Sequence, residues 1–527
     1  MSTATRLKEP SKRTKAVRKV VQKARGVIHP RVQLVGPEHF GVVCFDCAKA
    51  RSKWMLCDFY GNLLVEPTVL THAAGEFTSA IARLREAIEQ HRLQDCIVSI
   101  ERTGNYHLPI KRAYAAAGFE TRIVHPFATK QFRQPADPGN KTDDTDLAAI
   151  FRATVAGFSL TEAAWQPGYL ELRLLTRHRR DLIQKRSKVC CQIREHLEAI
   201  MPGYAACFVD LWDSAIALEL VRHFPSPQAL LAAGFEQVAN VLKKSGQRFV
   251  NSILEKVFVW ANLAAAPDVV AAMHHRVWQW LCDDYAHKCR EIAMLETDIA
   301  HLLVRTPYVL LLSFPGINVV SAGELAGEMG PIENYRNAKA ITGRAGIFPT
   351  RYQSDQVDLT HGSLVRCANR SLRAILLLIA DNLLKCNAHF RALAAVWKAQ
   401  GKAPQRAHVK IACRFTRILY QIVAGKQVFQ HPSCRQRDYI LAKLFAFLRN
   451  HDVVPENIHT ILQTTIEQLP TNTHKDEAIP LQPLLQKILA AKKGPQPIGD
   501  LLTVILAKLG DRDLQLKMSE EQDPSSS

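Results

Sequence analysis

Four carboxylate residues stand where they could act together on a phosphate ester. Asp46 and Glu101 each follow directly on a short apolar segment, and Asp143 and Asp146 lie three residues apart, on one face of an expected helix. Because like charges repel, such a cluster favours a hard divalent cation, whose preferred ligands are carboxylate oxygens. Two cations about 4 Å apart stabilise the attacking and leaving oxygens of a phosphodiester. Taken singly, Asp143 is also a plain helix cap and the others plain surface acids; taken together, they predict a metal-dependent site.

An alternation of strands and helices must bring these acids together. Apolar runs and helical spacing predict strands at 40–45, 53–59, 63–65, 96–100 and 121–124, and helices at 77–88, 106–117 and 142–153. Proline and glycine in 126–140 predict a loop, and Thr142 or Asp143 is expected to cap the helix that follows. Three strands followed by helix–strand–helix–strand–helix is the order of a ribonuclease H-like fold.

Composition narrows the class of protein. The 527 residues include 68 Lys and Arg against 49 Asp and Glu, a net charge of +19, which indicates a polyanionic partner, most simply nucleic acid. The sequence has no stretch of about 18 uncharged apolar residues, so we expect no membrane span. The 13 irregularly spaced cysteines and the absence of an apolar leader predict free thiols in the cytoplasm. The sequence has no P-loop motif, so an ATP-driven enzyme is not indicated.

The rest of the chain is predicted to be mainly helical, which makes the fold class α/β plus all-α. Heptad-like apolar seams in 170–200 and 285–302 indicate two long helices that pair as a hairpin, join a second subunit as a coiled coil, or belong to an ordinary bundle. Phe314–Asn318 has the shape of a helix-hairpin-helix turn. The expected segments are a basic arm (1–36), an α/β nuclease domain (37–160), a helical region with an insert (165–305), a further domain (306–430) and a helical C-terminal extension with a disordered end (431–527).

Several motifs together resemble one family, the DEDD transposases of the "one-ten" insertion-sequence group. Ile100–Tyr106 resembles its E-x-T-G-x-Y signature, and Asn140–Asp146 resembles N-K-T-D-x-x-D. In the second half, Phe314–Ile317 resembles the family's Pro-Gly start, and Arg344–Pro349 resembles its A-G-L-x-P stretch. Arg351–Ser354 then resembles the segment that carries a catalytic serine. These motifs cover about 40–155 and 306–430.

The resemblance implies a RuvC-like nuclease domain, a coiled-coil linker and a serine-bearing transposase domain. It implies that Asp46, Glu101, Asp143 and Asp146 hold Mg²⁺, as two ions for which Mn²⁺ can substitute, and that Ser354 is the nucleophile. Ser354 would attack a DNA phosphodiester and form a phosphoserine link, which a freed DNA end then attacks. The implied partners are element-end and target DNA, a noncoding bridge RNA that guides the reaction, and further copies of the chain, as homodimers that assemble to a tetramer. The implied location is the nucleoid.

Some residues depart from the family pattern. Asp355 follows Ser354 where small residues are usual, and Ala368 replaces a usual glycine. The other candidate nucleophiles are the hydroxyls of Ser321, Ser363 and Ser371. Three other functions remain open: a junction-resolving nuclease that uses water without a serine, an inactive nucleic-acid-binding relic, and a sugar kinase or actin-like ATPase. The last lacks the glycine-rich phosphate loops that it needs near the first strand.

Overall fold

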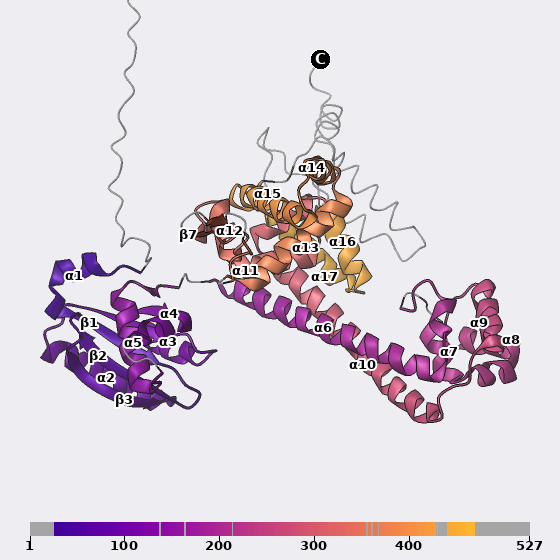
Figure 1. Ribbon diagram of the computed structural model, residues 1–527, viewed down its shortest axis with the longest axis horizontal. Helices are drawn as coiled ribbons and strands as arrows, with labels where there is room; N and C mark the ends of the chain where they lie inside the picture. Colours follow the sequence, from indigo (N-terminus) through magenta and orange to yellow (C-terminus); the bar gives the residue numbers. More distant parts are fainter. Residues whose placement is uncertain are drawn as a thin grey trace, which may run out of the picture. The chain divides into compact units, whose positions relative to one another are not determined.

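The structure, a computed structural model, describes residues 26–135, 139–162, 165–212, 214, 216–354, 357–359, 362–366, 368–427, 429 and 440–468. The chain divides into two units, residues 1–164 and 165–527, which are described separately (Figure 1). Most of the predicted basic arm and the predicted disordered end lie outside the described residues. None of the described helices is long and apolar enough to cross a membrane.

A six-stranded mixed sheet organises the first unit, in the order β3-β2-β1-β4-β5-β6. Its strands are β1 (Phe40–Asp46), β2 (Arg51–Asp58), β3 (Leu63–Thr71), β4 (Asp95–Glu101), β5 (Glu120–Val124) and β6 (Ser159–Leu160). Strand β1 pairs antiparallel with β2 and parallel with β4. Because β1 is central and covered on both faces, its first six residues are all buried, which is why a continuous apolar run predicted it.

Helices cover both faces of this sheet. They are α1 (His29–Val35), α2 (Ala74–Gln90), α3 (His107–Ala116), α4 (Pro126–Arg133) and α5 (Asp143–Val155), with a 3-10 turn η1 (Pro37–His39). Val43 and Phe45 share one apolar cluster with α2 and α3, whereas Val42 and Cys44 share another with α1, α4 and α5. Because successive side chains of β1 point to opposite faces of the sheet, this strand contributes to the apolar core on each face.

The loop predicted for 126–140 is wrong in its first half, where α4 forms. Pro126 occupies the first turn, where the missing N–H and fixed φ of proline suit a helix. The backbone N–H of Phe127 donates to Nδ1 of His125 at 3.1 Å, which caps the helix. Pro126, on which the loop prediction partly rests, begins a helix instead.

The second unit is mainly helical, in agreement with the predicted fold class. Its helices are α6 (Pro167–Ile200), α7 (Ala217–His223), α8 (Pro227–Lys244), α9 (Asn251–Leu263), α10 (Ala271–Leu303), α11 (Val319–Met329), α12 (Ala338–Ala345), α13 (Arg370–Cys386), α14 (Ala388–Ala399), α15 (Pro404–Ala424), α16 (Ile440–Asn450) and α17 (Pro455–Gln468). The short elements are η2 (Tyr204–Cys207), η3 (Pro307–Ser313), η4 (Ile332–Asn334) and a hairpin of β7 (Tyr352–Ser354) and β8 (Val357–Leu359).

The two predicted apolar seams lie on α6 and α10, which pack along each other within one chain. Their direction is antiparallel, because Leu172 shares a cluster with Ile299 while Nδ1 of His196 lies 2.8 Å from Nδ1 of His274. Helices α7 to α9, which lie between α6 and α10 in the sequence, form a lobe whose apolar cluster also includes residues of those two long helices. Of the pairings left open by the sequence, the hairpin within the chain is the one observed.

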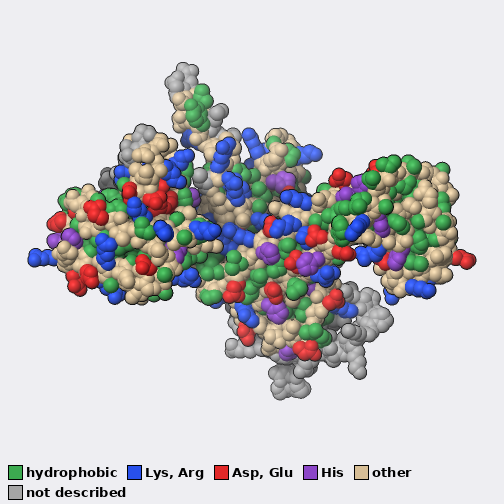
Figure 2. Space-filling model, turned by 90° about the horizontal axis from the view of Figure 1, so that it is seen from below, with side chains coloured by type: hydrophobic (Ala, Val, Ile, Leu, Met, Phe, Trp, Pro, Cys, Tyr) green, Lys and Arg blue, Asp and Glu red, His purple; other side chains and the backbone are tan. Residues whose placement is uncertain are grey.

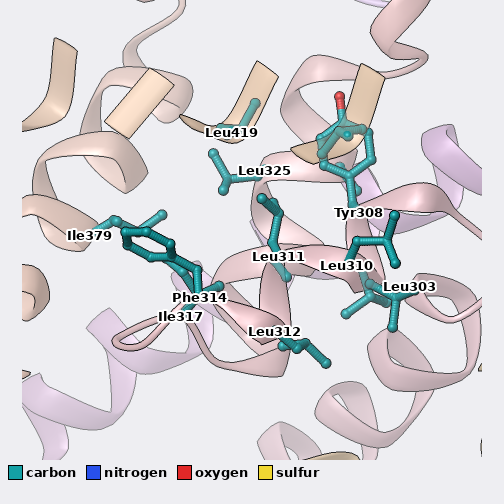
Figure 3. Packing of buried hydrophobic residues seen from close by; sticks show 14 of the residues in the cluster. Leu303, Tyr308, Leu310, Leu311, Leu312, Phe314, Ile317, Leu325, Ile379 and Leu419 are labelled. Carbon is teal, nitrogen blue, oxygen red and sulfur yellow. The ribbon is translucent and has the colours of Figure 1, made fainter. Parts of the chain in front are cut away.

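The main core of the second unit lies around η3 and α11. Leu311, Phe314 and Leu325 are fully buried there, among side chains from several helices (Figure 3). Leu444 of α16 and Ile461 of α17 belong to the same cluster. The described part of the C-terminal extension therefore completes this core.

The turn predicted as helix-hairpin-helix differs from that expectation. The segment before it is the 3-10 helix η3, not an α-helix. Three of its carbonyl oxygens, those of Leu312, Phe314 and Ile317, accept hydrogen bonds from Nζ of Lys443 at 2.7, 3.2 and 3.1 Å. The turn thus binds a cation of the chain itself.

Candidate active site

Asp46 and Glu101 lie side by side at one edge of the sheet in the first unit. Strands β1 and β4 are parallel with Phe45 opposite Ile100, so the next residue on each strand is one of these acids. Both side chains are half-buried. Burial, and then the nearby carboxylates of Glu101, Asp146 and Asp143, raise the pKa of Asp46 to about 7. All four predicted acids therefore interact at this edge.

The N-terminus of α5 positions the other two acids. Thr142 caps it in a reciprocal pair with Thr145: Oγ1 of Thr142 accepts from the Thr145 N–H at 3.2 Å, and Oγ1 of Thr145 accepts from the Thr142 N–H at 2.9 Å. Asp143 is exposed, whereas Asp146 is buried. The positive end of the helix dipole offsets part of their charge.

Two basic side chains lie beside the acids, and the sequence motifs indicated neither of them. Arg133, the last residue of α4, donates from Nη1 to Oδ1 of Asp146. Lys53 lies opposite Asp46 in the β1–β2 pair, and its Nζ is 2.5 Å from Oδ1 of Asp144. The hairpin register could have indicated Lys53, but Arg133 falls in the segment predicted as a loop.

The acid cluster fits a hard cation in its chemistry. Every donor is a carboxylate oxygen, and burial and the neighbouring carboxylates raise the pKa of Asp46, which a bound cation would counteract. Within the described ranges, however, no three His, Cys, Asp or Glu side chains already stand around one ion position. Arg133 is paired with the carboxylate of Asp146. These acids would therefore hold a metal only after Arg133 releases that carboxylate and Asp46 loses its proton.

Ser354 is the last residue of β7 in the second unit, and its side chain is exposed. An ion pair joins the two sides of the hairpin: Nε and Nη2 of Arg351 donate to the two carboxylate oxygens of Asp358 at 2.9 and 2.6 Å. Further down, the Thr350 N–H donates to the Ser363 carbonyl at 2.8 Å. The hairpin therefore presents the Ser354 hydroxyl to solvent on a braced strand.

The base of the hairpin is tied to the helices beneath it. Nε of Arg373 on α13 donates to the Ala345 carbonyl at 2.9 Å, and Nδ2 of Asn369 donates to Glu328 at 2.8 Å. Burial would raise the pKa of Glu328, but hydrogen bonds from Arg177 and Asn369 outweigh it and hold that pKa below its usual value. The segment that carries Ser354 is thus anchored through a buried carboxylate.

Among the other candidate nucleophiles, Ser321 is committed to structure. Its hydroxyl accepts from the Asn318 N–H and donates to the Asn318 carbonyl, both at 3.0 Å, and the residue is buried in the first turn of α11. Ser363 is exposed and Ser371 half-buried. Ser354 thus remains the predicted nucleophile.

Comparison with known sequences supplies a family. A profile of DEDD transposases, described as "Transposase", matches residues 43–202, which include the four acids. A second profile, described as the transposase IS116/IS110/IS902 family, matches residues 308–395, which include Ser354. Both halves of the chain match the IS110 family of transposases. The resemblance read from the motifs is confirmed.

Relatives in this family are distant. The chain is 24% identical over 273 residues to the uncharacterized 42 kDa protein of insertion element IS900 from Mycobacterium paratuberculosis, which covers 50% of this chain and 66% of that protein. It is 23% identical over 263 residues to the uncharacterized 44.8 kDa protein of IS116 from Streptomyces clavuligerus, covering 49% and 64%. It is also 23% identical to the uncharacterized 43.6 kDa protein of IS110 from Streptomyces coelicolor, in a match that covers 54% of this chain and 71% of that protein. The chain thus spans about two thirds of the length of these relatives.

Proposed function

We propose that this protein is an insertion-element transposase that cuts and rejoins DNA through a covalent link to Ser354. In this proposal Asp46, Glu101, Asp143 and Asp146 hold Mg²⁺. The observation that carries it is the meeting of four acids at the ends of β1 and β4, in a chain whose two family matches are both to transposases. The strand order β3-β2-β1-β4-β5, with an antiparallel first half, supports a ribonuclease H-like, RuvC-like identity for the sheet.

The proposed chemistry keeps the number of phosphodiester bonds constant. The Ser354 oxygen attacks phosphorus and loses its proton, a serine–phosphate bond forms, and the bond to one strand breaks to leave a free hydroxyl. A DNA hydroxyl then attacks the link and restores the serine. Bound metal would offset the charge that develops on the phosphate oxygens. No ATP is required, in keeping with the absence of a P-loop motif from the sequence.

The exposed hairpin supports the role of Ser354. A nucleophile for a phosphate within a DNA duplex must reach out from the protein surface, and Ser354 does so on a strand that the Arg351–Asp358 pair braces. Ser354 and the acids belong to different units of the chain. Assembly into dimers and tetramers, in which separate subunits supply the two groups, is part of the proposal.

Guidance by a bridge RNA is also part of the proposal. If an RNA selects the sites, the protein needs mainly to grip phosphates, and the net charge of +19 suits that task. Deletion of the noncoding sequence that flanks the element should then abolish recombination, whereas restoration of that RNA from another locus should recover it.

A covalent-trapping assay tests the reaction. Purified protein, Mg²⁺, flanking RNA and labelled junction DNA are incubated and separated on a denaturing gel. We expect a protein–DNA adduct that Ser354→Ala and Asp46→Asn both abolish, and that Ser363→Ala, the matched control just after the same hairpin, retains. Mn²⁺ should substitute for Mg²⁺. Cleavage without an adduct would instead identify a water-using nuclease, and DNA binding without any cleavage would identify an inactive relic.

A further inference from the structure

Helix α15 presents a row of cations on its exposed face. Arg406, Lys410, Arg414 and Arg417 are spaced by four, four and three residues, so they follow one side of the helix, and all four are exposed. We call these four residues the α15 stripe. The opposite face carries apolar side chains such as Phe415, which is fully buried in the main core. The amphipathic pattern thus fixes which way the stripe faces.

Among the described residues, no acidic side chain pairs with the α15 stripe. A hydrogen bond with Lys402, then desolvation and the charges of Lys402, Arg414 and Arg406, lower the pKa of Lys410. Figure 2 shows one face of the molecule, on which both basic and acidic side chains occur. A row of like charges without acidic partners attracts an anion.

Trp397 of α14 holds part of this row in place. Nζ of Lys410 lies 5.3 Å from the centre of its ring, and Cζ of Arg414 lies 5.4 Å from it. The ring itself is 8% exposed, so it serves as a fixed platform rather than as a surface for stacking a base. Cation–π contacts of this kind order long side chains before a ligand arrives.

The α15 stripe is fixed relative to the Ser354 hairpin. Helix α15 packs against α12 and α13, the helices that flank the hairpin in the sequence. Sγ of Cys413 donates to the carbonyl of Ile347 at 3.6 Å, just before the hairpin begins, and the Tyr420 hydroxyl donates to the Arg336 carbonyl at 3.2 Å. A ligand held on the stripe would therefore be held at a set position with respect to Ser354.

We propose that the α15 stripe grips the phosphate backbone of the duplex DNA on which Ser354 acts; this inference rests on the proposed function. Four helical residues rise about 6 Å, so the stripe offers evenly spaced cations along about 16 Å of helix. Such a row suits successive phosphates of one strand, and contacts of this kind position DNA without reading its sequence. The occupant is duplex DNA because that is the substrate of the proposed reaction. The stripe lies beyond the 308–395 match.

The test measures binding of a short labelled DNA duplex by anisotropy over a range of salt concentrations. Arg406→Gln, Lys410→Gln and Arg414→Gln are combined in one full-length variant. Loss of three phosphate contacts should weaken binding at least tenfold and reduce the slope of log K against log salt by about 3. A charge-retaining variant, Arg406→Lys with Arg414→Lys, should bind nearly as the wild type does.

The matched control removes three exposed cations from the lobe of α8 and α9, by combining Lys243→Gln, Lys244→Gln and Lys256→Gln. Equal weakening by the control and stripe variants would overturn the proposal, because it would show a general charge effect. An RNA duplex of the same sequence is the second arm. If the stripe variant lost RNA binding and kept DNA binding, the proposed occupant would be wrong.

The Ser354 adduct separates this inference from the proposed function. At saturating DNA the stripe variant should still form the adduct, because its nucleophile is intact. A wild-type protein that binds DNA through the stripe but forms no adduct would refute the proposed function alone. A stripe variant with unchanged DNA affinity and a normal adduct would refute the stripe alone.

Discussion

Replacement of Asp46 by Asn should make the first unit more stable while it abolishes the adduct. In the unfolded chain the pKa of Asp46 takes its ordinary value of 3.8, but in the folded protein it is about 7. Between these values the folded state keeps a proton that the unfolded state has lost, so stability falls as the pH rises through this window. Above pH 7 the full cost of the buried, repelled carboxylate is present.

The size of the effect follows from the shift. About 3 pKa units correspond to about 4 kcal/mol at about 1.4 kcal/mol per unit. Because the side chain is partly exposed, solvent screening reduces this cost to about 2 kcal/mol. Asn has nearly the same shape and no charge, so Asp46→Asn should recover about 2 kcal/mol at pH 8 and less than about 1 kcal/mol at pH 5.

Hydrogen exchange in the full-length protein, without metal, measures this difference locally. Peptides from β1 and β4 should exchange about 30-fold more slowly in Asp46→Asn at pH 8, after correction for the intrinsic rate. Asp58→Asn is the matched control in the same sheet. Asp58 accepts hydrogen bonds from the backbone and side chain of Asn62 at 2.9 and 2.7 Å, so its replacement should speed exchange. Equal exchange in wild type and Asp46→Asn at pH 8 would refute the repulsion argument. Added Mg²⁺ should protect the wild type more than the variant.

Further predictions concern the second unit and can be checked by denaturant unfolding. Gly327→Ala should cost about 1–3 kcal/mol, because the new Cβ would lie 2.7 Å from the backbone nitrogen of Arg173. Lys443→Met should cost about 2 kcal/mol, since three carbonyls lose a charged donor; unchanged stability would show that water replaces it. Glu328→Gln removes the carboxylate that pairs with Arg177. In the wild type the pKa of Glu328 lies below the ordinary 4.5. The deficit of that variant should therefore shrink as the pH falls below about 4.5, where the wild type loses the same ion pair.

The acids of the first unit could be predicted because each one ends a pattern that local sequence defines. A buried parallel strand is a continuous apolar run, and a polar residue directly after it marks the sheet edge, as Asp46 and Glu101 do. Asp143 and Asp146 follow a recognisable helix cap. Local pattern therefore contained most of the acid cluster.

The cations around the site could not be predicted in the same way. Arg133 reaches Asp146 only because α4 packs on α5, a tertiary contact with no local signature. The helical spacing of the α15 stripe could be found in the sequence. Its lack of acidic partners among the described residues, however, is a property of the folded surface. Similarly, the apolar residues before Phe314 do not distinguish the 3-10 helix η3 from an α-helix.

The composition of the main core has a consequence for synthesis of the protein. Leu172 near the start of the second unit and Ile461 near its described end belong to one cluster, so this core closes only after almost all of the described part of that unit has been made. The sheet and helices of the first unit, by contrast, are complete by residue 160. Domains generally fold as they emerge, N-terminal first. The acid cluster should therefore form on the ribosome well before the Ser354 hairpin has its support, and a chain interrupted in translation would carry the acids without an anchored nucleophile.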